Sequence, residues 1–233
     1  MKYFFFKEIK FYSGEYQDIK KEFDKGGVLV APAASALANI SDDKIYYKSL
    51  IASNIAILDS GFFCILLRFL SFKKVKKLSG YLFLRNFLEN YNNDDRILLI
   101  NPSIQSDELN SKLIKSLKID NFKSYIAPLY HLDFADLNLL NLINEFKPRY
   151  IMINIGGGKQ EPLGIYIREN IDFKSSILCT GAAIAFMTGE QAPITKIIDK
   201  FYLGWLYRII WNPVTNFQRF LKSFKIIKFF LIK

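Results

Sequence analysis

Cysteine and histidine are scarce in this sequence, and long apolar runs are missing. The chain of 233 residues has two cysteines, Cys64 and Cys179, and one histidine. Both cysteines lie in apolar stretches far from one another, which indicates small buried hydrophobes rather than a disulfide or a metal pair. No stretch of about 18 uninterrupted apolar residues occurs, so no transmembrane helix is predicted. The apolar run at the N-terminus is too short for a signal peptide, and we expect a cytoplasmic protein.

Acidic residues are absent from two long segments, although the chain carries 22 of them. Residues 201–233 hold six basic residues, residues 60–88 hold another six, and the formal net charge is +10. Basic patches attract phosphates, which nucleic acids, anionic lipids and nucleotide substrates all carry. We rank nucleic acid last among these partners, because no recognisable nucleic-acid-binding module accompanies the charge.

Apolar, β-branched runs alternate with helical patterns along most of the chain. This alternation predicts an α/β fold with a Rossmann-like, mostly parallel sheet and helices on both faces. Residues 1–25 should contribute an early strand and turn, and residues 31–35 a turn. A helix is expected over residues 41–53, with Ser41 as its N-cap. Other strands are expected at 27–30, 54–58, 96–100, 124–128, 150–155 and 176–180, and other helices at 62–72, 81–91, 106–119, 136–146 and about 160–170.

The C-terminal segment departs from this alternation, so we divide the chain into an α/β domain, 1–200, and a basic amphipathic appendage, 201–233. On a helix, one face of the appendage would carry Phe217, Phe220, Phe224, Ile227 and Leu231. Further apolar residues fall among the lysines of the opposite side. Such a helix suits the headgroup boundary of an anionic membrane. The alternative is a helix packed on the core whose lysines extend along it into water.

Three consecutive glycines, Gly156, Gly157 and Gly158, follow the apolar run 151–155. Lys159, Gln160 and Glu161 come directly after them. The glycines allow a sharp turn and close approach of a ligand, and the N–H groups of a following helix N-terminus favour anions. The alternative is a tight strand-to-helix turn that binds nothing. The spacing matches neither the dinucleotide-binding nor the P-loop pattern.

Asp59 ends a predicted strand at the same sheet edge as the three glycines. A carboxylate in that position could act as the general base toward a substrate hydroxyl. The alternative is an aspartate that caps the following helix, which is a common role in a strand-to-helix turn.

Three segments of the chain carry motifs of one known group of enzymes. Residues 30–61 are similar to a T-P-N opening followed by a D-G motif, and residues 155–161 to a G-x-G-x-P-K-Q-E loop. Residues 181–208 are similar to a G-G-A-F-D-F-x-x-G, R-A-P and E-W-L-Y-R signature. Together the motifs resemble those of the WecG/TagA/CpsF glycosyltransferases (glycosyltransferase family 26).

This resemblance implies an inverting transfer of an N-acetylmannosamine-type sugar from a UDP donor, without a metal or cofactor. The acceptor would be a sugar on a polyprenyl diphosphate, used in making teichoic acid or another cell-surface polysaccharide. The protein would act peripherally at the inner face of the cell membrane, which residues 213–233 would contact. The sequence leaves the oligomeric state open, a homo-oligomer included.

The resemblance also assigns roles to individual residues. Asp59 would be the base, and basic side chains would stabilise the UDP leaving group in place of a metal. The residues expected to bind substrate are Gly156, Gly157, Gly158, Lys159, Gln160, Glu161, Lys77, Gly181 and Arg208.

Several polar residues of the family motifs are replaced in this chain. Ala31 and Ala33 stand where the family has Thr and Asn, and Ala185 and Gln191 where it has Asp and Arg. Lys77 stands for an arginine, which keeps the charge but loses bidentate geometry. The first glycine of the nucleotide loop corresponds to Asn154, its proline to Gly158, and the Glu before W-L-Y-R to Gly204. These replacements favour an alternative function, a catalytically impaired member that binds nucleotide or lipid.

Overall fold

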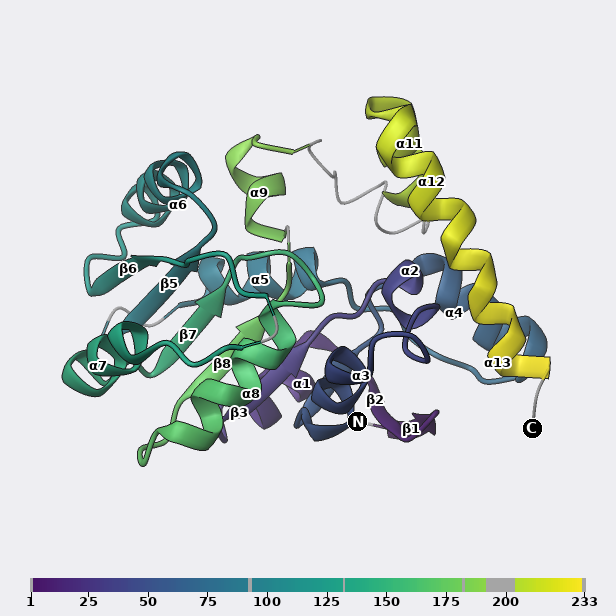
Figure 1. Ribbon diagram of the computed structural model, residues 1–233, viewed down its shortest axis with the longest axis horizontal. Helices are drawn as coiled ribbons and strands as arrows, with labels where there is room; N and C mark the ends of the chain where they lie inside the picture. Colours follow the sequence, from purple (N-terminus) through teal and green to yellow (C-terminus); the bar gives the residue numbers. More distant parts are fainter. Residues whose placement is uncertain (1, 92–93, 132, 182, 192–203, 232–233) are drawn as a thin grey trace.

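A single eight-stranded sheet organises the chain, in the order β1-β2-β4-β3-β8-β7-β5-β6 (Figure 1). The computed structural model describes residues 2–91, 94–131, 133–181, 183–191 and 204–231. The β1–β2 hairpin is antiparallel, and every other pairing between these strands is parallel, which confirms the predicted α/β class. The strands are β1 (Lys2–Phe6), β2 (Ile9–Ser13), β3 (Gly27–Val30), β4 (Ile55–Ile57), β5 (Ile97–Asn101), β6 (Phe122–Ile126), β7 (Tyr150–Ile153) and β8 (Ser176–Cys179).

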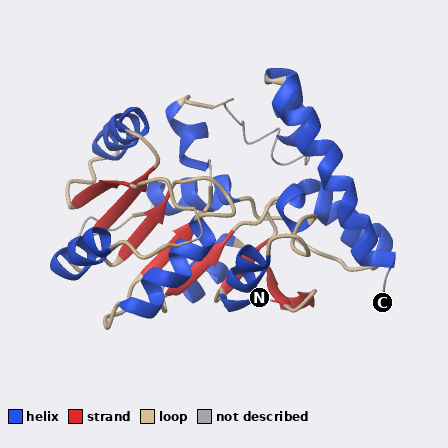
Figure 2. Cartoon of the chain, viewed as in Figure 1, coloured by secondary structure: helices blue, strands red, loops and turns tan. Residues whose placement is uncertain are grey.

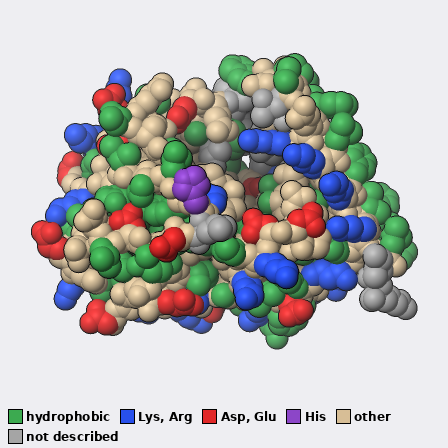
Figure 3. Space-filling view, in the orientation of Figure 1, with side chains coloured by type: hydrophobic (Ala, Val, Ile, Leu, Met, Phe, Trp, Pro, Cys, Tyr) green, Lys and Arg blue, Asp and Glu red, His purple; other side chains and the backbone are tan. Residues whose placement is uncertain are grey.

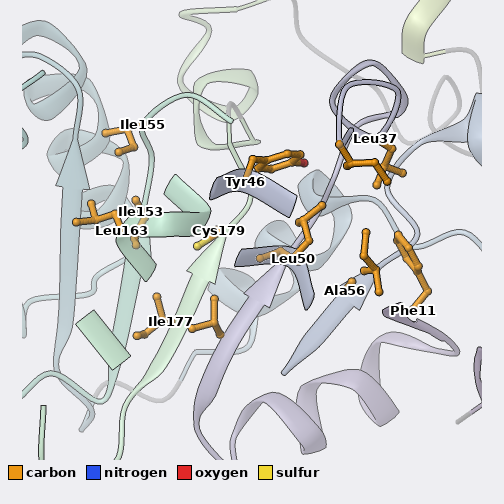
Figure 4. Packing of buried hydrophobic residues seen from close by; sticks show 14 of the residues in the cluster. Phe11, Leu37, Tyr46, Leu50, Ala56, Ile153, Ile155, Leu163, Ile177 and Cys179 are labelled. Carbon is orange, nitrogen blue, oxygen red and sulfur yellow. The ribbon is translucent and has the colours of Figure 1, made fainter. Parts of the chain in front are cut away.

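Helices cover both faces of the sheet, as the alternating pattern predicted (Figure 2). Successive residues of a strand point to opposite faces, so Val28 and Val30 enter one buried cluster and Leu29 enters the other. Figure 4 shows the first cluster, where Leu50 and Leu163 come from helices on that face. The helices of the sheet region are α1 (Tyr16–Phe23), α2 (Ala34–Leu37), α3 (Lys44–Ala52), α4 (Gly61–Leu70), α5 (Gly80–Glu89), α6 (Ile104–Ser116), α7 (Leu137–Phe146), α8 (Gln160–Asn170) and α9 (Ala183–Thr188).

Three local predictions differ from the structure. Helix α1 was missed, although Ile19 and Phe23 form its buried side. Residues 31–35 were expected to turn, but the short helix α2 begins within them at Ala34. Helix α3 begins at Lys44 rather than near Ser41, because the side chain of Asp43 accepts a hydrogen bond from the N–H of Tyr46 at 2.9 Å and caps the helix.

The C-terminal helices pack against the end of the domain beside α2 and α4. They are α11 (Gly204–Trp211), α12 (Pro213–Ser223), the 3₁₀ turn η1 (Phe224–Ile227) and α13 (Lys228–Leu231), and we call them together the tail. Ile226 is fully buried, and Phe230 lies 5.0 Å from Phe6 between ring centroids. Of the predicted apolar face, Phe220 and Ile227 are partly buried, whereas Phe217 and Leu231 are at least half exposed. The predicted apolar face is therefore packed at some positions and exposed at others.

None of the helices within the described ranges is long and apolar enough to cross a bilayer.

Candidate functional site

The carboxyl edge of the sheet contains a point where successive connections leave in opposite directions. Strands β3 and β8 are neighbours. Leu50 of α3, the helix that leads from β3 to β4, packs in one buried cluster, and Ile184 of α9, which follows β8, packs in the other. Ligands of open α/β sheets bind in the crevice at such a switch point. The residues after β3, β4, β7 and β8 all reach this edge.

The loop after β7, residues 154–159, is open on its outer side, and we call it the glycine loop. Gly156 and Gly157 are exposed, and a Cβ built on either of them, or on Gly158, meets no atom within 4 Å. Gly158 has φ +87°, a conformation that favours glycine. The space above the loop is therefore accessible to a ligand. Beneath it, several backbone N–H groups at the start of α8 already make hydrogen bonds within the loop.

One of these hydrogen bonds is made by the side chain of Glu161. Its buried carboxylate accepts hydrogen bonds from the N–H of Gly158 at 2.7 Å and from Nε2 of Gln160 at 3.0 Å. Burial raises the pKa of this carboxyl, against the opposing effect of these hydrogen bonds. The N–H groups of Lys159 and Gln160 bond to the carbonyl oxygen of Gly156. These bonds engage the N–H groups of Gly158, Lys159 and Gln160, and binding of an anion at this turn stays a prediction.

Gln160 connects the glycine loop to the turn after β8. Its Oε1 accepts a hydrogen bond from the N–H of Gly181 at 2.8 Å, and Gly181 has φ +64°. Gln160 and Glu161 are both buried, so they shape the loop from below. Lys159 is exposed, but its Nζ donates to the carbonyl oxygen of His131 and lies 5.7 Å from the ring centroid of Phe134. Direct contact of Lys159, Gln160 and Glu161 with substrate stays a prediction.

Asp59 lies two residues after the end of β4 and anchors the start of α5 rather than of the helix that follows it directly. Its Oδ1 accepts a hydrogen bond from the N–H of Gly80, the first residue of α5, at 2.8 Å. The following helix, α4, is capped instead by Ser60, whose side chain accepts from the N–H of Phe63. The N–H of Leu78 donates to Leu58, which lays the segment that carries Lys77 alongside the end of β4. Asp59 is half-buried and fixed in position at the crevice.

An open recess of about 460 Å³ lies between the glycine loop, α2–α3 and the tail, and we call it the tail recess. Lys222 and Lys225 line it from the tail, opposite Gly157 and Gly158. Figure 3 shows Lys and Arg side chains on the side of the tail that faces the hollow, and hydrophobic side chains along its outer edge. These two lysines bring positive charge to the recess, which the acids Asp42 and Asp43 also line.

Tyr46 of α3 also lines the tail recess, near several acids. Burial raises the pKa of its hydroxyl well above 10, and the charges of Glu161, Asp43 and Asp59 raise it further. The hydroxyl therefore stays protonated at neutral pH and remains a hydrogen-bond donor.

A second, smaller recess of about 160 Å³ lies on the other side of the glycine loop, and we call it the amide recess. Asn110 of α6 and Asn154 of the glycine loop line it, together with Ser106, Ala185 and Glu190. Both recesses meet at the loop, since Gly156 lines one and Gly157 and Gly158 line the other.

The structure thus brings the glycine loop, Gly181 and Asp59 to one edge, with Lys77 in the segment beside it. Arg208 lies on α11, but its side chain is outside the described part of the chain. Sequence reasoning missed Lys222 and Lys225 as partners of the glycine loop, and it missed the asparagines of the amide recess. The basic composition of the tail was the available signal for the lysines. For the asparagines, the only signal was Asn101-Pro102 at the end of a predicted strand.

No curated protein matches the sequence significantly. The sequence profile described as the glycosyl transferase WecG/TagA/CpsF family matches residues 12–233, which include every strand after β2 and the whole site. The chain therefore belongs to the WecG/TagA/CpsF family of glycosyltransferases.

Proposed function

We propose that this glycosyltransferase moves an N-acetylmannosamine-type sugar from a UDP donor to a sugar on a polyprenyl diphosphate. Family membership supplies the general class, a transferase of cell-surface polysaccharide synthesis with a sugar-nucleotide donor and a lipid-linked acceptor. The observation that supports the finer assignment is the arrangement at the crevice. Two tail lysines, Lys222 and Lys225, line the recess beside the open glycine loop together with the acids Asp42 and Asp43. Asp59 follows β4 at the same edge of the sheet.

The proposed reaction is a direct displacement that inverts the anomeric carbon. Asp59 takes the proton of the acceptor hydroxyl as the hydroxyl oxygen attacks that carbon, and the bond from the carbon to the phosphate oxygen of UDP breaks. The Gly80 N–H fixes one carboxylate oxygen, which holds the base in place during the attack. Negative charge that develops on UDP is stabilised by cationic side chains, among which we place Lys222 and Lys225.

Neutralising the two tail lysines should weaken use of the donor. We expect Lys222→Gln with Lys225→Gln to lower kcat/KM for the donor about 100-fold, because each lysine loses a charge-assisted contact to phosphate. Steady-state UDP release with a soluble short-chain acceptor measures this. Arg219→Gln with Lys228→Gln removes the same number of charges from exposed or partly exposed tail positions outside the tail recess and serves as the control. Equal kcat/KM in the two double variants would contradict the role of the lysines.

The function itself is tested by a donor screen with a lipid-linked N-acetylglucosamine acceptor. UDP-N-acetylmannosamine and UDP-N-acetylglucosamine are offered in parallel, and both UDP release and the extended glycolipid are measured. We expect transfer from the mannosamine-type donor with inversion at the anomeric carbon. Transfer from the glucosamine-type donor alone would overturn the assigned sugar.

A second candidate, a binding protein without transfer, is favoured by the residues lost from the family motifs. Ala185 is buried in the wall of the amide recess where the family has an aspartate, and Gln191 lines the same recess in place of an arginine. Ala31 and Ala33 remove a hydroxyl and an amide after β3. Nucleotide binding without turnover of any donor in the screen would select this candidate.

We further propose that residues 201–233 form the membrane-contacting appendage of a domain that spans residues 1–200. The tail keeps large apolar side chains exposed on its outer side, with Trp211 at 61%, Val214 at 76% and Phe217 at 50% exposure. Its lysines at the tail recess lie on the other side, toward the site. Contact of the outer side with an anionic membrane would place the crevice beside a lipid-linked acceptor at the inner face.

A further inference from the structure

Three asparagines at the carboxyl edge form a hydrogen-bonded cluster whose orientation is set by one acid. The carboxylate of Asp107 can only accept hydrogen bonds when ionised, and it accepts one from Nδ2 of Asn101 at 2.7 Å. Oδ1 of Asn101 must then face the other way, where it accepts from Nδ2 of Asn110 and from Nδ2 of Asn154, both at 2.8 Å. The two outer amides are therefore turned so that their own oxygens face away from Asn101.

Those two amide oxygens are buried and accept no hydrogen bond from any residue in the described ranges. Asn110 is 1% exposed and Asn154 is 8% exposed, and both line the amide recess. Buried polar atoms are nearly always hydrogen-bonded, and an unpaired buried acceptor is costly. A pair of such acceptors in the wall of one recess indicates a ligand group that donates hydrogen bonds.

The other groups of the amide recess specify a neutral ligand. No described residue that lines it is cationic, and the carboxylate of Glu190 accepts a hydrogen bond from Ser106 at 2.7 Å. Phosphate is disfavoured by this set of acceptors. The volume of about 160 Å³ is close to that of cavities known to hold one six-membered ring.

The place of the recess in the sheet separates it from the reacting end of the donor. Asp59 follows β4, whereas Asn154 follows β7 and Asn101 ends β5. In the sheet order β7 lies three positions from β4, or about 14 Å at the usual strand spacing. A sugar that reacts beside Asp59 cannot also fill the amide recess, but the opposite end of an extended nucleotide sugar can.

We propose that the amide recess binds the nucleobase of the donor, with Oδ1 of Asn110 and Oδ1 of Asn154 as the acceptors for its N–H edge. For uracil the donor is the imide N3–H. The diphosphate then crosses the glycine loop toward Lys222 and Lys225, and the sugar reaches Asp59. Asp107 is a positioning residue, because it orients the amides through Asn101 without lining the recess. This inference rests on the proposed nucleotide-sugar function.

The test compares UDP with UDP methylated at N3, which lacks the imide N–H, in calorimetric titrations of the full chain. We expect the natural chain to bind UDP about tenfold or more tightly than the methylated form, since the methyl group leaves a buried acceptor unpaired. Asn154→Ala and Asn110→Ala should each reduce this discrimination severalfold. Asp107→Asn should reduce it as well, because a carboxamide at that position can also donate, and Asn101 is then free to flip. Glu108→Gln, an exposed acid on the same helix, is the matched control and should leave the ratio unchanged.

The outcomes separate the base-binding inference from the function on which it rests. Equal binding of UDP and methylated UDP by the natural chain would overturn the inference while leaving nucleotide binding in place. Asparagine variants that weaken binding of a UDP-sugar but not of UDP would also overturn it, since the recess would then hold the sugar. Binding of neither UDP nor UDP-sugar would overturn the inference and the proposed function together. Thermal unfolding of each variant identifies any that fails to fold, and the discrimination ratio is then read from the remaining variants.

Discussion

Replacing Asp59 with asparagine is expected to lower kcat by about 100-fold or more without loss of the fold. Asparagine keeps an oxygen at the position that accepts the Gly80 N–H at 2.8 Å, so the start of α5 stays anchored. It cannot take a proton from the acceptor hydroxyl, and removal of a general base costs about 10² to 10⁴ in rate. UDP release is measured at saturating donor and acceptor, and the KM for the donor should change little.

The neighbouring Ser60 provides the control for Asp59. Ser60→Ala removes the side-chain cap of α4, which should lower the free energy of unfolding by about 1 kcal/mol. It should leave kcat per folded molecule near its original value, because the Ser60 hydroxyl bonds to the N–H of Phe63 in α4 and is assigned no part in the reaction. Turnover in Asp59→Asn within a few-fold of the natural chain would show that Asp59 serves only to anchor α5.

The strands could be predicted because their signal is local. Runs such as 97–100 and 150–153 consist of apolar and aromatic residues and enter a sheet that is covered on both faces, so composition alone marks them. The N-terminal region shows the limit of this reasoning. The apolar positions of α1 lie in a charged segment, and they acquire meaning only when Phe23 packs against Phe83 and Phe87 from α5.

The site was only partly predictable, for a related reason. Asp59 and the glycine loop lie at strand ends, and parallel strands bring their carboxyl ends to one edge, so their place at the same edge follows from the fold class. Lys222 and Lys225 reach Gly157 and Gly158 through the docking of the tail, which depends on contacts such as Phe62 with Phe224 at 5.1 Å. No local pattern encodes that docking.

Glu161 shows how a motif residue can have a different local role from the one its spacing suggests. An acidic residue in the first turn of a helix is favourable on electrostatic grounds alone. Here the carboxylate of Glu161 folds back and accepts a hydrogen bond from the N–H of Gly158. That N–H belongs to the turn at which the sequence predicts an anion, and anion binding there stays a prediction. This bond fixes the loop, and we propose that Lys222 and Lys225 of the tail add positive charge for phosphate.

Membrane contact by the tail is expected to depend on its exposed apolar side chains, and the structure shows which of them can be changed safely. Deleting everything after Pro213 would remove Ile226, which is fully buried, and Phe230, which packs against Phe63. The truncated chain would expose core surface, so its behaviour with liposomes could not be interpreted. Val214, Phe217 and Leu221 are half or more exposed and can be replaced without opening the core.

Replacing Val214, Phe217 and Leu221 with glutamine should release the protein from anionic liposomes. Burying each large apolar side chain is favourable by roughly 1.5–3 kcal/mol, so loss of three should weaken partitioning 100-fold or more even though the lysines remain. Sedimentation with phosphatidylglycerol-containing vesicles measures this. Leu129→Gln with Leu137→Gln changes exposed apolar residues on the β6–α7 side and should leave binding intact.

Activity assays on the same triple variant connect this surface to catalysis. Transfer to an acceptor embedded in vesicles should fall in parallel with binding, whereas transfer to a soluble short-chain acceptor should stay near normal, because the three side chains lie outside the tail recess. Sedimentation equal to that of the natural chain would contradict the membrane role of the outer side. Loss of activity toward both acceptors would instead show that these side chains support the position of Lys222 and Lys225 over the glycine loop.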